Sequence, residues 1–282
     1  GKTNKLRHHD DGKKPNNNSF SFKTLGEKMA GKFIGIGVGP GDPELITIKA
    51  VKALESADVI CIPKSNANKP SLALTMVKKI LSDRKNQPEM LELIFPMTKD
   101  DMSNKALWVK NASIIAQKVN SGKVIAFITL GDPMFYSTFI YLYQSLKEEY
   151  PKLLLEIIPG VTSLTACAAS AKIPLAEKEE VITIIPSDLD TKLVEETARR
   201  SDNLVFIKCA YRLKELVPIL ERAGFKENST IALVRRCSMP EEEVTVGKLC
   251  DVKNWKIHED YFSMAIVKKN LLSKDVKVKH DE

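Results

Sequence analysis

Residues 34–43 read IGIGVGPGDP, with a glycine at every second position running into an Asp-Pro pair. Lys32 and Phe33 before this stretch, with Ile34 and Ile36 within it, suit a β-strand. Apolar residues after them recur with the spacing of one helix face: Leu45, Ile48, Val51 and Leu54. Asp42 suits the N-cap of this helix, with Pro43 in its first position. The stretch predicts a strand-to-helix crossing at which glycine lets a ligand approach the main chain.

The glycine spacing argues against a dinucleotide-binding loop. In the two possible frames of G-x-G-x-x-G/A, the sixth position is Pro40 or Asp42. Pro40 has no N–H to offer a pyrophosphate, and the carboxylate of Asp42 would repel one. A P-loop is excluded because no Gly-Lys-Ser/Thr follows. A glycine-rich turn without a ligand is the remaining alternative for this segment alone.

Two further strand ends carry similar residues. Residues 123–130 (KVIAFITL) form an apolar run typical of a strand covered on both faces, and GDPMFYST (131–138) follows. Residues 154–158 (LLEII) lead into PGVTS (159–163), before a helix of small residues over 166–171. Because ligands in open parallel sheets bind beyond the carboxyl ends of the strands, these three loops predict one ligand site.

The pattern along the chain predicts an α/β protein. In the first half we expect strands near 32–37, 59–62, 91–94, 124–129 and 153–158, alternating with helices near 43–56, 70–82, 102–120 and 134–149. In the second half we expect helices near 162–171, 190–200 and 211–223, with strands near 181–185, 204–208, 230–235, 243–247 and 261–268. We therefore predict two α/β domains, 29–158 and 159–282, meeting directly over a ligand cleft because no long linker separates them.

The amino-terminal 28 residues differ in composition from the rest. They hold seven Lys or Arg against three Asp or Glu, which is four of the seven net positive charges of the 282-residue chain. They lack a helix or strand period, so we expect 1–28 to be a disordered leader or added residues, with Met29 as a plausible native start. A basic tail that binds nucleic acid is the alternative, but aromatic residues do not interleave its charges as that would require.

Cysteine and histidine spacing speak against metal and redox chemistry. The five cysteines are scattered without a C-x-x-C pair, a pattern typical of reduced thiols in a cytoplasmic protein. Beyond the leader, His258 and His280 are not spaced with other ligands as a metal site demands, so we expect no metal. No G-x-S-x-G motif, Cys-His signature, membrane-length apolar stretch or signal peptide stands out.

Four motifs together resemble the tetrapyrrole (corrin/porphyrin) methylases, most closely the precorrin-2 and cobalt-factor II carbon-20 methyltransferases. The motifs are GVGPGDPELITIKAVKAL (37–54), NKPSLAL (68–74), GDPMFYST (131–138) and PGVTSLTACAA (159–169). The first and third place the chain in the superfamily, and the second and fourth suggest the carbon-20 branch. The resemblance runs from about Met29 to the carboxyl terminus.

The resemblance implies an S-adenosylmethionine-dependent enzyme with cofactor and substrate between two domains, S-adenosylhomocysteine as a product, and a homodimer as the usual assembly. Matching motif positions implies these cofactor contacts: Pro40, Leu130, Gly131, Asp132, Thr162 and Ser163, and less directly Ile207, Lys208 and Ala232. Asp132 can alternatively act as a helix N-cap before Pro133, and both roles are compatible.

The acceptor in the resembling family is a macrocycle with eight carboxylates, which favours Lys and Arg at the rim of the cleft. The candidates here are Lys64, Lys69, Lys99, Arg235 and Arg236, each with the alternative of being a solvated surface charge. Arg235 and Arg236 stand out because they close an apolar strand, where cleft residues are expected.

Catalysis by such an enzyme asks little of side chains, since an electron-rich ring carbon can attack a sulfonium methyl that is held in line. Thr138 occupies the position where some relatives place an arginine, so that proposed base does not carry over. Tyr136 is a candidate acid/base or ring contact, or simply a packed aromatic.

Two other classes remain open beside a carbon-20 methylase of cobalt-factor II or precorrin-2. One is a methylase of the same fold that acts on another tetrapyrrole or on a macromolecule, such as ribosomal RNA or diphthamide. The small net charge outside the leader speaks against a nucleic-acid substrate. The other is a non-catalytic metabolite-binding module.

We predict that removing residues 1–28 leaves methyl transfer unchanged, because no functional motif falls in that segment. Rates of the full chain and of a chain starting at Met29, measured at equal concentration, would check this. A clear loss of rate would give the leader a functional role.

Overall fold

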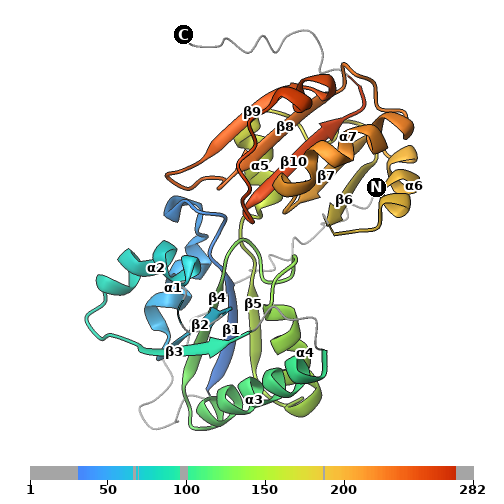
Figure 1. Ribbon diagram of the computed structural model, residues 1–282. Helices are drawn as coiled ribbons and strands as arrows, with labels where there is room; N and C mark the ends of the chain where they lie inside the picture. The colour runs from blue at the N-terminus through green and yellow to red at the C-terminus, as the bar shows by residue number, and fades with distance from the viewer. Residues whose placement is uncertain (1–30, 66–67, 69, 96–100, 187, 271–282) are drawn as a thin grey trace, which may run out of the picture.

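The computed structural model describes residues 31–65, 68, 70–95, 101–186 and 188–270, with the side chains of 101–103 excepted. These residues form two lobes, each built on a five-stranded sheet (Figure 1). The expected leader 1–28, Met29, the substrate candidates Lys69 and Lys99, and His280 lie outside the described residues. No helix within the described part of the chain is long and apolar enough to cross a membrane.

The first sheet is parallel throughout. Its strands are β1 (Lys32–Gly37), β2 (Val59–Lys64), β3 (Glu89–Ile94), β4 (Val124–Thr129) and β5 (Leu155–Ile158), in the order β3-β2-β4-β1-β5. All five expected strands are confirmed. Since β1 lies between β4 and β5, the three strands that end in the predicted ligand loops are neighbours.

Helices cover both faces of this sheet. The elements are η1 (Pro43–Leu45), α1 (Ile48–Ser56), α2 (Leu72–Ser82), α3 (Asp101–Asn120) and α4 (Phe139–Glu149). Apolar side chains of α1 and α2 pack on one face, and those of α3 and α4 on the other. Because helices cover both faces, the inner strands β2, β4 and β1 are apolar along most of their length.

Two helix boundaries differ from expectation. Asp42 does act as an N-cap, accepting a hydrogen bond from the Glu44 N–H at 2.8 Å, but it begins only a short 3-10 turn. The α-helix starts at Ile48, where Thr47 takes over as the cap. The expected helix at 134–149 begins only at Phe139, so residues 134–138 stay in the loop and remain available to a ligand.

The second sheet is mixed. Its strands are β6 (Ile182–Pro186), β7 (Asn203–Ile207), β8 (Thr230–Arg235), β9 (Glu243–Lys248) and β10 (Ser263–Lys268), in the order β6-β7-β10-β8-β9. Only β6 and β7 are parallel, while β10 runs antiparallel to both of its neighbours. The sequence did not predict these strand directions.

Helices of the second lobe are divided between its two faces. They are α5 (Ser163–Ala171), α6 (Thr191–Arg199) and α7 (Leu213–Arg222), with short 3-10 segments η2 (Ala210–Arg212) and η3 (Leu249–Asn254). α6, α7 and η3 pack on one face and α5 on the other. β5 leads into α5 through residues 159–162 alone, and the domain division at 158/159 stays a prediction.

The three glycine loops, defined as residues 38–42, 130–138 and 159–162, meet main chain to main chain at the ends of β1, β4 and β5. Gly131 N–H donates to the Gly39 carbonyl at 2.7 Å, and Gly39 N–H donates back to Gly131 at 3.3 Å. A Cβ on Gly37 would lie 2.5 Å from the Gly131 oxygen, and one on Gly160 only 2.1 Å from it. Glycine is therefore required at Gly37 and Gly160 for backbone packing.

Replacing Gly160 by Ala should lower the free energy of unfolding by about 2 kcal/mol or more, because the new methyl overlaps a main-chain carbonyl that cannot move aside. Gly131→Ala is the contrasting variant: its Cβ meets nothing nearer than 3.9 Å, so it carries mainly the cost of a φ of +64°, about 1–2 kcal/mol. Urea unfolding of both variants would test whether Gly160→Ala is the less stable of the two. A Gly160 variant as stable as the Gly131 variant would contradict the packing argument.

Candidate functional site

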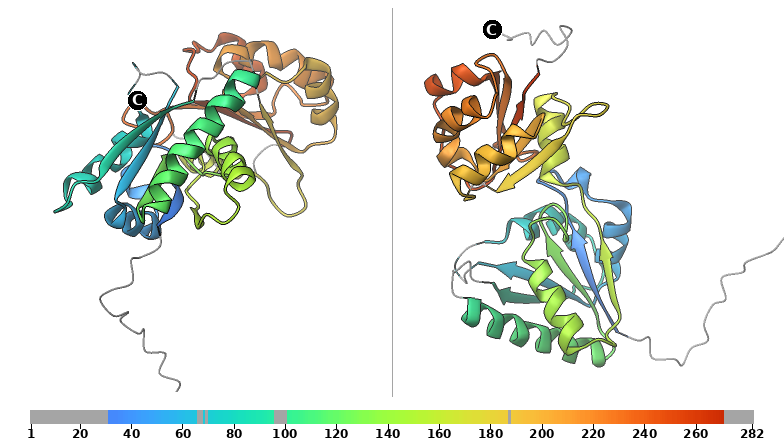
Figure 2. Two further views of the ribbon diagram at one scale, coloured as in Figure 1. Left: turned by 90° about the horizontal axis from the view of Figure 1, so that it is seen from below. Right: turned by 90° about the vertical axis from the view of Figure 1, so that its right-hand side faces the viewer.

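Residues of both lobes line a cavity of about 290 Å³. Figure 2 shows the two lobes from two further sides. The first lobe contributes residues of the first two glycine loops, and Thr162 of the third loop, which links the lobes, lines the cavity as well. The second lobe contributes residues at the carboxyl ends of β7 and β8 and at the amino end of β10. A site built from both lobes is the arrangement that the sequence predicted.

The structure brings together eight of the nine expected cofactor residues, which all line this cavity: Pro40, Leu130, Gly131, Asp132, Thr162, Ser163, Ile207 and Lys208. The ninth, Ala232, does not reach it. Ala232 is fully buried in the middle of β8, within the cluster of side chains beneath α5. Tyr136 and Thr138 also line the cavity.

Asp132 joins two of the glycine loops. One carboxylate oxygen accepts the Met134 N–H at 2.8 Å, and the other accepts the Gly160 N–H at 3.0 Å. The alternative role as a helix N-cap is wrong, because α4 begins only at Phe139. Since each oxygen has a second lone pair, Asp132 can hold the loops together and still accept a bond from a ligand.

Thr162 begins α5 at the edge of the cavity. Its hydroxyl oxygen accepts the Thr165 N–H at 3.4 Å as the N-cap of the helix. The next residue, Ser163, begins the helix and lines the cavity as well. Main-chain N–H groups of this first turn give that side of the cavity a partial positive charge.

Backbone strain is concentrated around the cavity. Six described residues other than glycine have positive φ, and four of them line the cavity or flank its residue Cys237: Tyr136, Lys208, Arg236 and Ser238. Such conformations cost about 1–3 kcal/mol each and persist only where neighbouring groups hold them. Here the Lys208 N–H donates to Ser263 at 2.7 Å, and the Ser238 hydroxyl accepts the Asp42 N–H at 3.1 Å.

Two buried cysteines form part of the cavity wall. Cys167 of α5 and Cys237 after β8 both line it, and the Cys237 sulfur lies 3.7 Å from the Ser170 hydroxyl. The hydrogen bond with Cys237, followed by burial, raises the pKa of the Cys167 thiol. Cys167 is therefore an uncharged part of the wall at neutral pH. The described residues hold no cluster of three or more side chains suited to a metal.

Comparison with known proteins identifies the family. The model of the tetrapyrrole (corrin/porphyrin) methylases matches residues 32–253. This chain belongs to the tetrapyrrole methylases. A probable cobalt-precorrin-2 C(20)-methyltransferase of Methanocaldococcus jannaschii is 35% identical over 86% of this chain and 98% of its own length. The cobalt-precorrin-2 C(20)-methyltransferase of Salmonella typhimurium is 34% identical over the same shares.

Solved structures of other tetrapyrrole methylases share the fold. A cobalt precorrin-4 methyltransferase has a TM-score of 0.63 at 21% identity, covering 87% of this chain and 98% of that one. The uroporphyrin-III C-methyltransferase of Thermus thermophilus, complexed with S-adenosylhomocysteine, has a TM-score of 0.60 at 22% identity, covering 84% of this chain and 97% of that one. These likenesses confirm the expected two-part α/β fold.

Several cavity residues of this tetrapyrrole methylase escaped the sequence analysis, notably Tyr261, Phe262 and Met239. Ligand sites were expected at the carboxyl ends of parallel strands. β10 runs antiparallel, so its amino end lies beside the carboxyl ends of β7 and β8. The strand near 261–268 was expected, and its direction would have revealed Tyr261 and Phe262. Met239 lies in the segment between β8 and β9, where no motif marked it.

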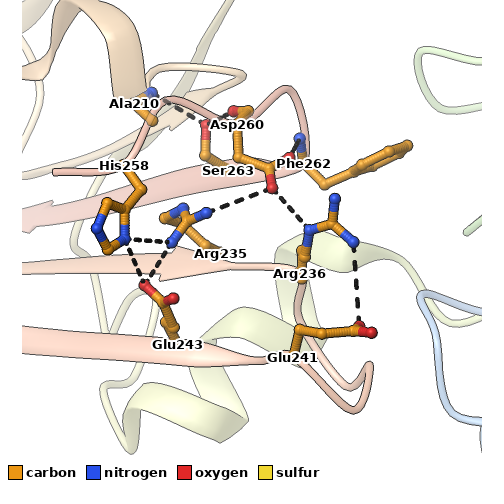
Figure 3. Close-up of polar contacts among 9 residues, drawn as sticks. All are labelled: Ala210, Arg235, Arg236, Glu241, Glu243, His258, Asp260, Phe262 and Ser263. Carbon is orange, nitrogen blue, oxygen red and sulfur yellow. Dashed lines mark hydrogen bonds and ion pairs between the residues drawn. The ribbon is translucent and has the colours of Figure 1, made fainter.

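The three described substrate candidates, Lys64, Arg235 and Arg236, do not line the cavity. Figure 3 shows the polar contacts of the two arginines. Arg235 pairs with Glu243 and lies 3.4 Å from Asp260, and its side chain is only 12% exposed. Arg236 donates to the same Asp260 oxygen at 2.7 Å. Lys64 pairs with Glu92 at 3.0 Å. Each cation thus has a carboxylate partner within the protein, so a substrate role for any of them stays a prediction.

Asp260 organises the segment in front of β10. Besides both arginines, it accepts the Phe262 N–H at 2.9 Å, and its main-chain oxygen accepts the Ser263 hydroxyl at 2.8 Å. Burial raises the pKa of Asp260, but the bonds from Arg236 and Phe262 and the charges of both arginines outweigh it and hold the pKa below its usual value. Asp260 is therefore ionised at neutral pH and fixes Phe262 beside the cavity.

Asp260→Asn should lower the free energy of unfolding at pH 7 by about 1–3 kcal/mol, because it leaves two guanidinium groups without this charged partner. Since the folded-state pKa is depressed, the contribution is fully present above the unfolded-state pKa of Asp, about 3.9, and is lost as pH falls through the folded value. Unfolding should be followed from pH 7 to 3, with the exposed Asp188→Asn as control. A difference between wild type and Asp260→Asn that stays constant down to pH 3 would contradict this.

Proposed function

We propose that this tetrapyrrole methylase transfers a methyl group from S-adenosylmethionine to carbon 20 of cobalt-factor II or precorrin-2 in cobalamin biosynthesis. The observation that carries the proposal is the identity of 35% and 34% to two relatives named for that cobalt-precorrin-2 reaction, each matched over 98% of its own length. A precorrin-2 C(20)-methyltransferase of Sinorhizobium sp is 28% identical over 80% of this chain. The cobalt-containing acceptor is favoured on this similarity.

The cavity has the features that the cofactor needs. S-adenosylmethionine, when bound, supplies a methyl group on a sulfonium sulfur, which a nucleophilic carbon can attack. Main-chain groups of Pro40, Leu130, Gly131 and Asp132, with Thr162 and Ser163, would hold its polar parts. The main chain of Ile207 and Lys208 would close the cofactor site from the other lobe. A volume of about 290 Å³ is close to the lower end for small-ligand sites. Ala232 is not part of this proposal.

The chain contributes position more than proton transfer. Among described residues lining the cavity, the side chains with an ionisable group are those of Asp132, Tyr136, Cys167, Lys208, Cys237 and Tyr261. Both oxygens of Asp132 already bind main-chain N–H groups, and Cys167 stays a thiol. Thr138 lines the cavity where some relatives have an arginine. Rigid placement of the acceptor carbon in line with the methyl and sulfur is therefore the main source of acceleration.

The other function classes have less support. A methylase of RNA or another macromolecule would need a basic stripe, whereas the chain after residue 28 carries a net charge of only +3. A metabolite-binding module without activity would not account for the similarity to two named transferases over their full length. Another tetrapyrrole acceptor is a finer alternative that the experiment below separates. We also propose a homodimer in the cytoplasm, with neither nucleic acid nor membrane as a partner.

Calorimetry with S-adenosylhomocysteine should show tight binding, as expected for the spent cofactor of a methylase. Incubation with S-adenosylmethionine and purified precorrin-2, or its cobalt complex, should add one methyl to the mass of the tetrapyrrole and change its visible spectrum. Uroporphyrinogen III and a later corrin intermediate serve as comparison acceptors. Tight binding of S-adenosylhomocysteine with no mass change in any acceptor would overturn the enzyme assignment, and methylation of a comparison acceptor alone would overturn the carbon-20 assignment.

A further inference from the structure

The cavity cannot enclose both a cofactor and a macrocycle. Its volume of about 290 Å³ suits one small molecule. A ring of four pyrroles with acidic side chains is larger than that, so it must lie mainly at the mouth. Residues that line the cavity and are still exposed therefore become the candidates for contact with the acceptor.

Two exposed tyrosines meet this description, one from each lobe. Tyr136 of the second glycine loop is 54% exposed, and Tyr261 in front of β10 is 48% exposed, although both line the cavity. Each is braced edge-to-face by its neighbour, with ring centres 5.0 Å apart for Phe135–Tyr136 and 5.4 Å for Tyr261–Phe262. Rigid aromatic side chains at the mouth suit a flat conjugated ligand, which they can contact at low entropic cost.

Lys208 is the one basic residue among the described residues that line the cavity. Its ammonium group lies 4.3 Å from the centre of the Tyr261 ring, which holds it by a cation–π contact. It forms no ion pair with any other described residue, in contrast to Lys64, Arg235 and Arg236. Its charge is therefore available to an anionic ligand, whereas theirs are already matched within the protein.

The main chain fixes both sides of this mouth. Tyr136 has a φ of 50° and Lys208 a φ of 58°, a region that is unfavourable for side chains of their size. The Lys208 main chain is held by its N–H bond to Ser263, the first residue of β10, two positions after Tyr261. The end of β7 and the start of β10 thus position Lys208 and Tyr261 together.

We propose that Lys208, held against Tyr261, binds a carboxylate of the tetrapyrrole acceptor while the rings of Tyr261 and Tyr136 contact its conjugated surface. The proposal rests on the proposed function for the nature of the acceptor. The sequence had led us to expect that Arg235 and Arg236 hold the acceptor and that Lys208 holds the cofactor. The proposal instead assigns the Lys208 side chain to the acceptor. An ion pair between Lys208 and a carboxylate of the acceptor, formed at this half-buried site, would both attract the acceptor and fix its orientation.

The test compares Lys208→Met with Lys192→Met, an exposed lysine on α6 in the same lobe that does not line the cavity. Lys208→Met should raise the KM for the tetrapyrrole about tenfold, as the loss of one charge-assisted hydrogen bond would. The Kd for S-adenosylhomocysteine, measured by calorimetry, should change less than about twofold. Lys192→Met should leave both constants unchanged.

Tyr261→Leu removes the ring that holds the ammonium group and should raise the same KM several-fold with the lysine still present. The KM of the wild type should rise with salt, and the Lys208→Met variant should show a flatter dependence, because screening acts on a charged contact. A merely structural role for Lys208 would not change the salt dependence. Lys208→Gln, checked by circular dichroism, replaces the Met variant if that one does not fold.

An unchanged tetrapyrrole KM in Lys208→Met and Lys208→Gln would overturn the proposal. An equal loss of affinity for S-adenosylhomocysteine would overturn it too, because Lys208 would then be a cofactor residue. If neither Lys208 variant folds, a wild-type KM for the tetrapyrrole that does not change with salt would overturn the proposal. Absence of methylation by the wild type would instead contradict the proposed function, which distinguishes the two failures.

Discussion

The main-chain contact between Gly37, Gly131 and Gly160 is the constraint on which the rest of the site depends. Three neighbouring parallel strands end at the same level, and their loops approach so closely that a methyl on Gly37 or Gly160 would overlap a backbone oxygen. Asp132 then fixes the arrangement, because its carboxylate accepts main-chain N–H groups from its own loop and from Gly160. The floor of the cavity is thus made of peptide groups that can move little.

The same glycine segment also reaches the second lobe. Asp42 donates its N–H to the Ser238 hydroxyl, and a Cβ on Gly41 would lie 2.6 Å from the Met239 side chain. Ser238 in turn donates its N–H to Glu242, whose carboxylate also accepts the Ser170 hydroxyl of α5. The segment after β8 is therefore held between the first lobe and α5, and the strained residues beside Cys237 lie where the two lobes meet.

Local patterns predicted what depends on local sequence. Apolar runs located the strands, and glycine with Asp-Pro or Pro-Gly located the loops. The cofactor residues expected in these loops all line the cavity. Local patterns do not show which residues distant in the chain will pair or pack together. Arg235 closes an apolar strand as expected, but Asp260 and Glu243, 25 and 8 residues away in the chain, take up its charge. Ala232 is likewise one residue among many in an apolar strand, and only the packing of α5 shows that it is buried in the core.

The distribution of charge explains why a lysine, and not an arginine, remains at the mouth. The guanidinium groups of Arg235 and Arg236 share the carboxylate of Asp260, which also accepts the Phe262 N–H. The Ser263 hydroxyl donates to the Asp260 main-chain oxygen and accepts the Ala210 N–H. A bidentate, permanently charged group suits this structural task. Lys208 lies on the other side of β10 from them, since β10 separates β7 from β8. Its single ammonium group rests on a ring instead of a carboxylate. It can therefore pair with a ligand carboxylate without first breaking an internal salt bridge, which would offset most of the gain.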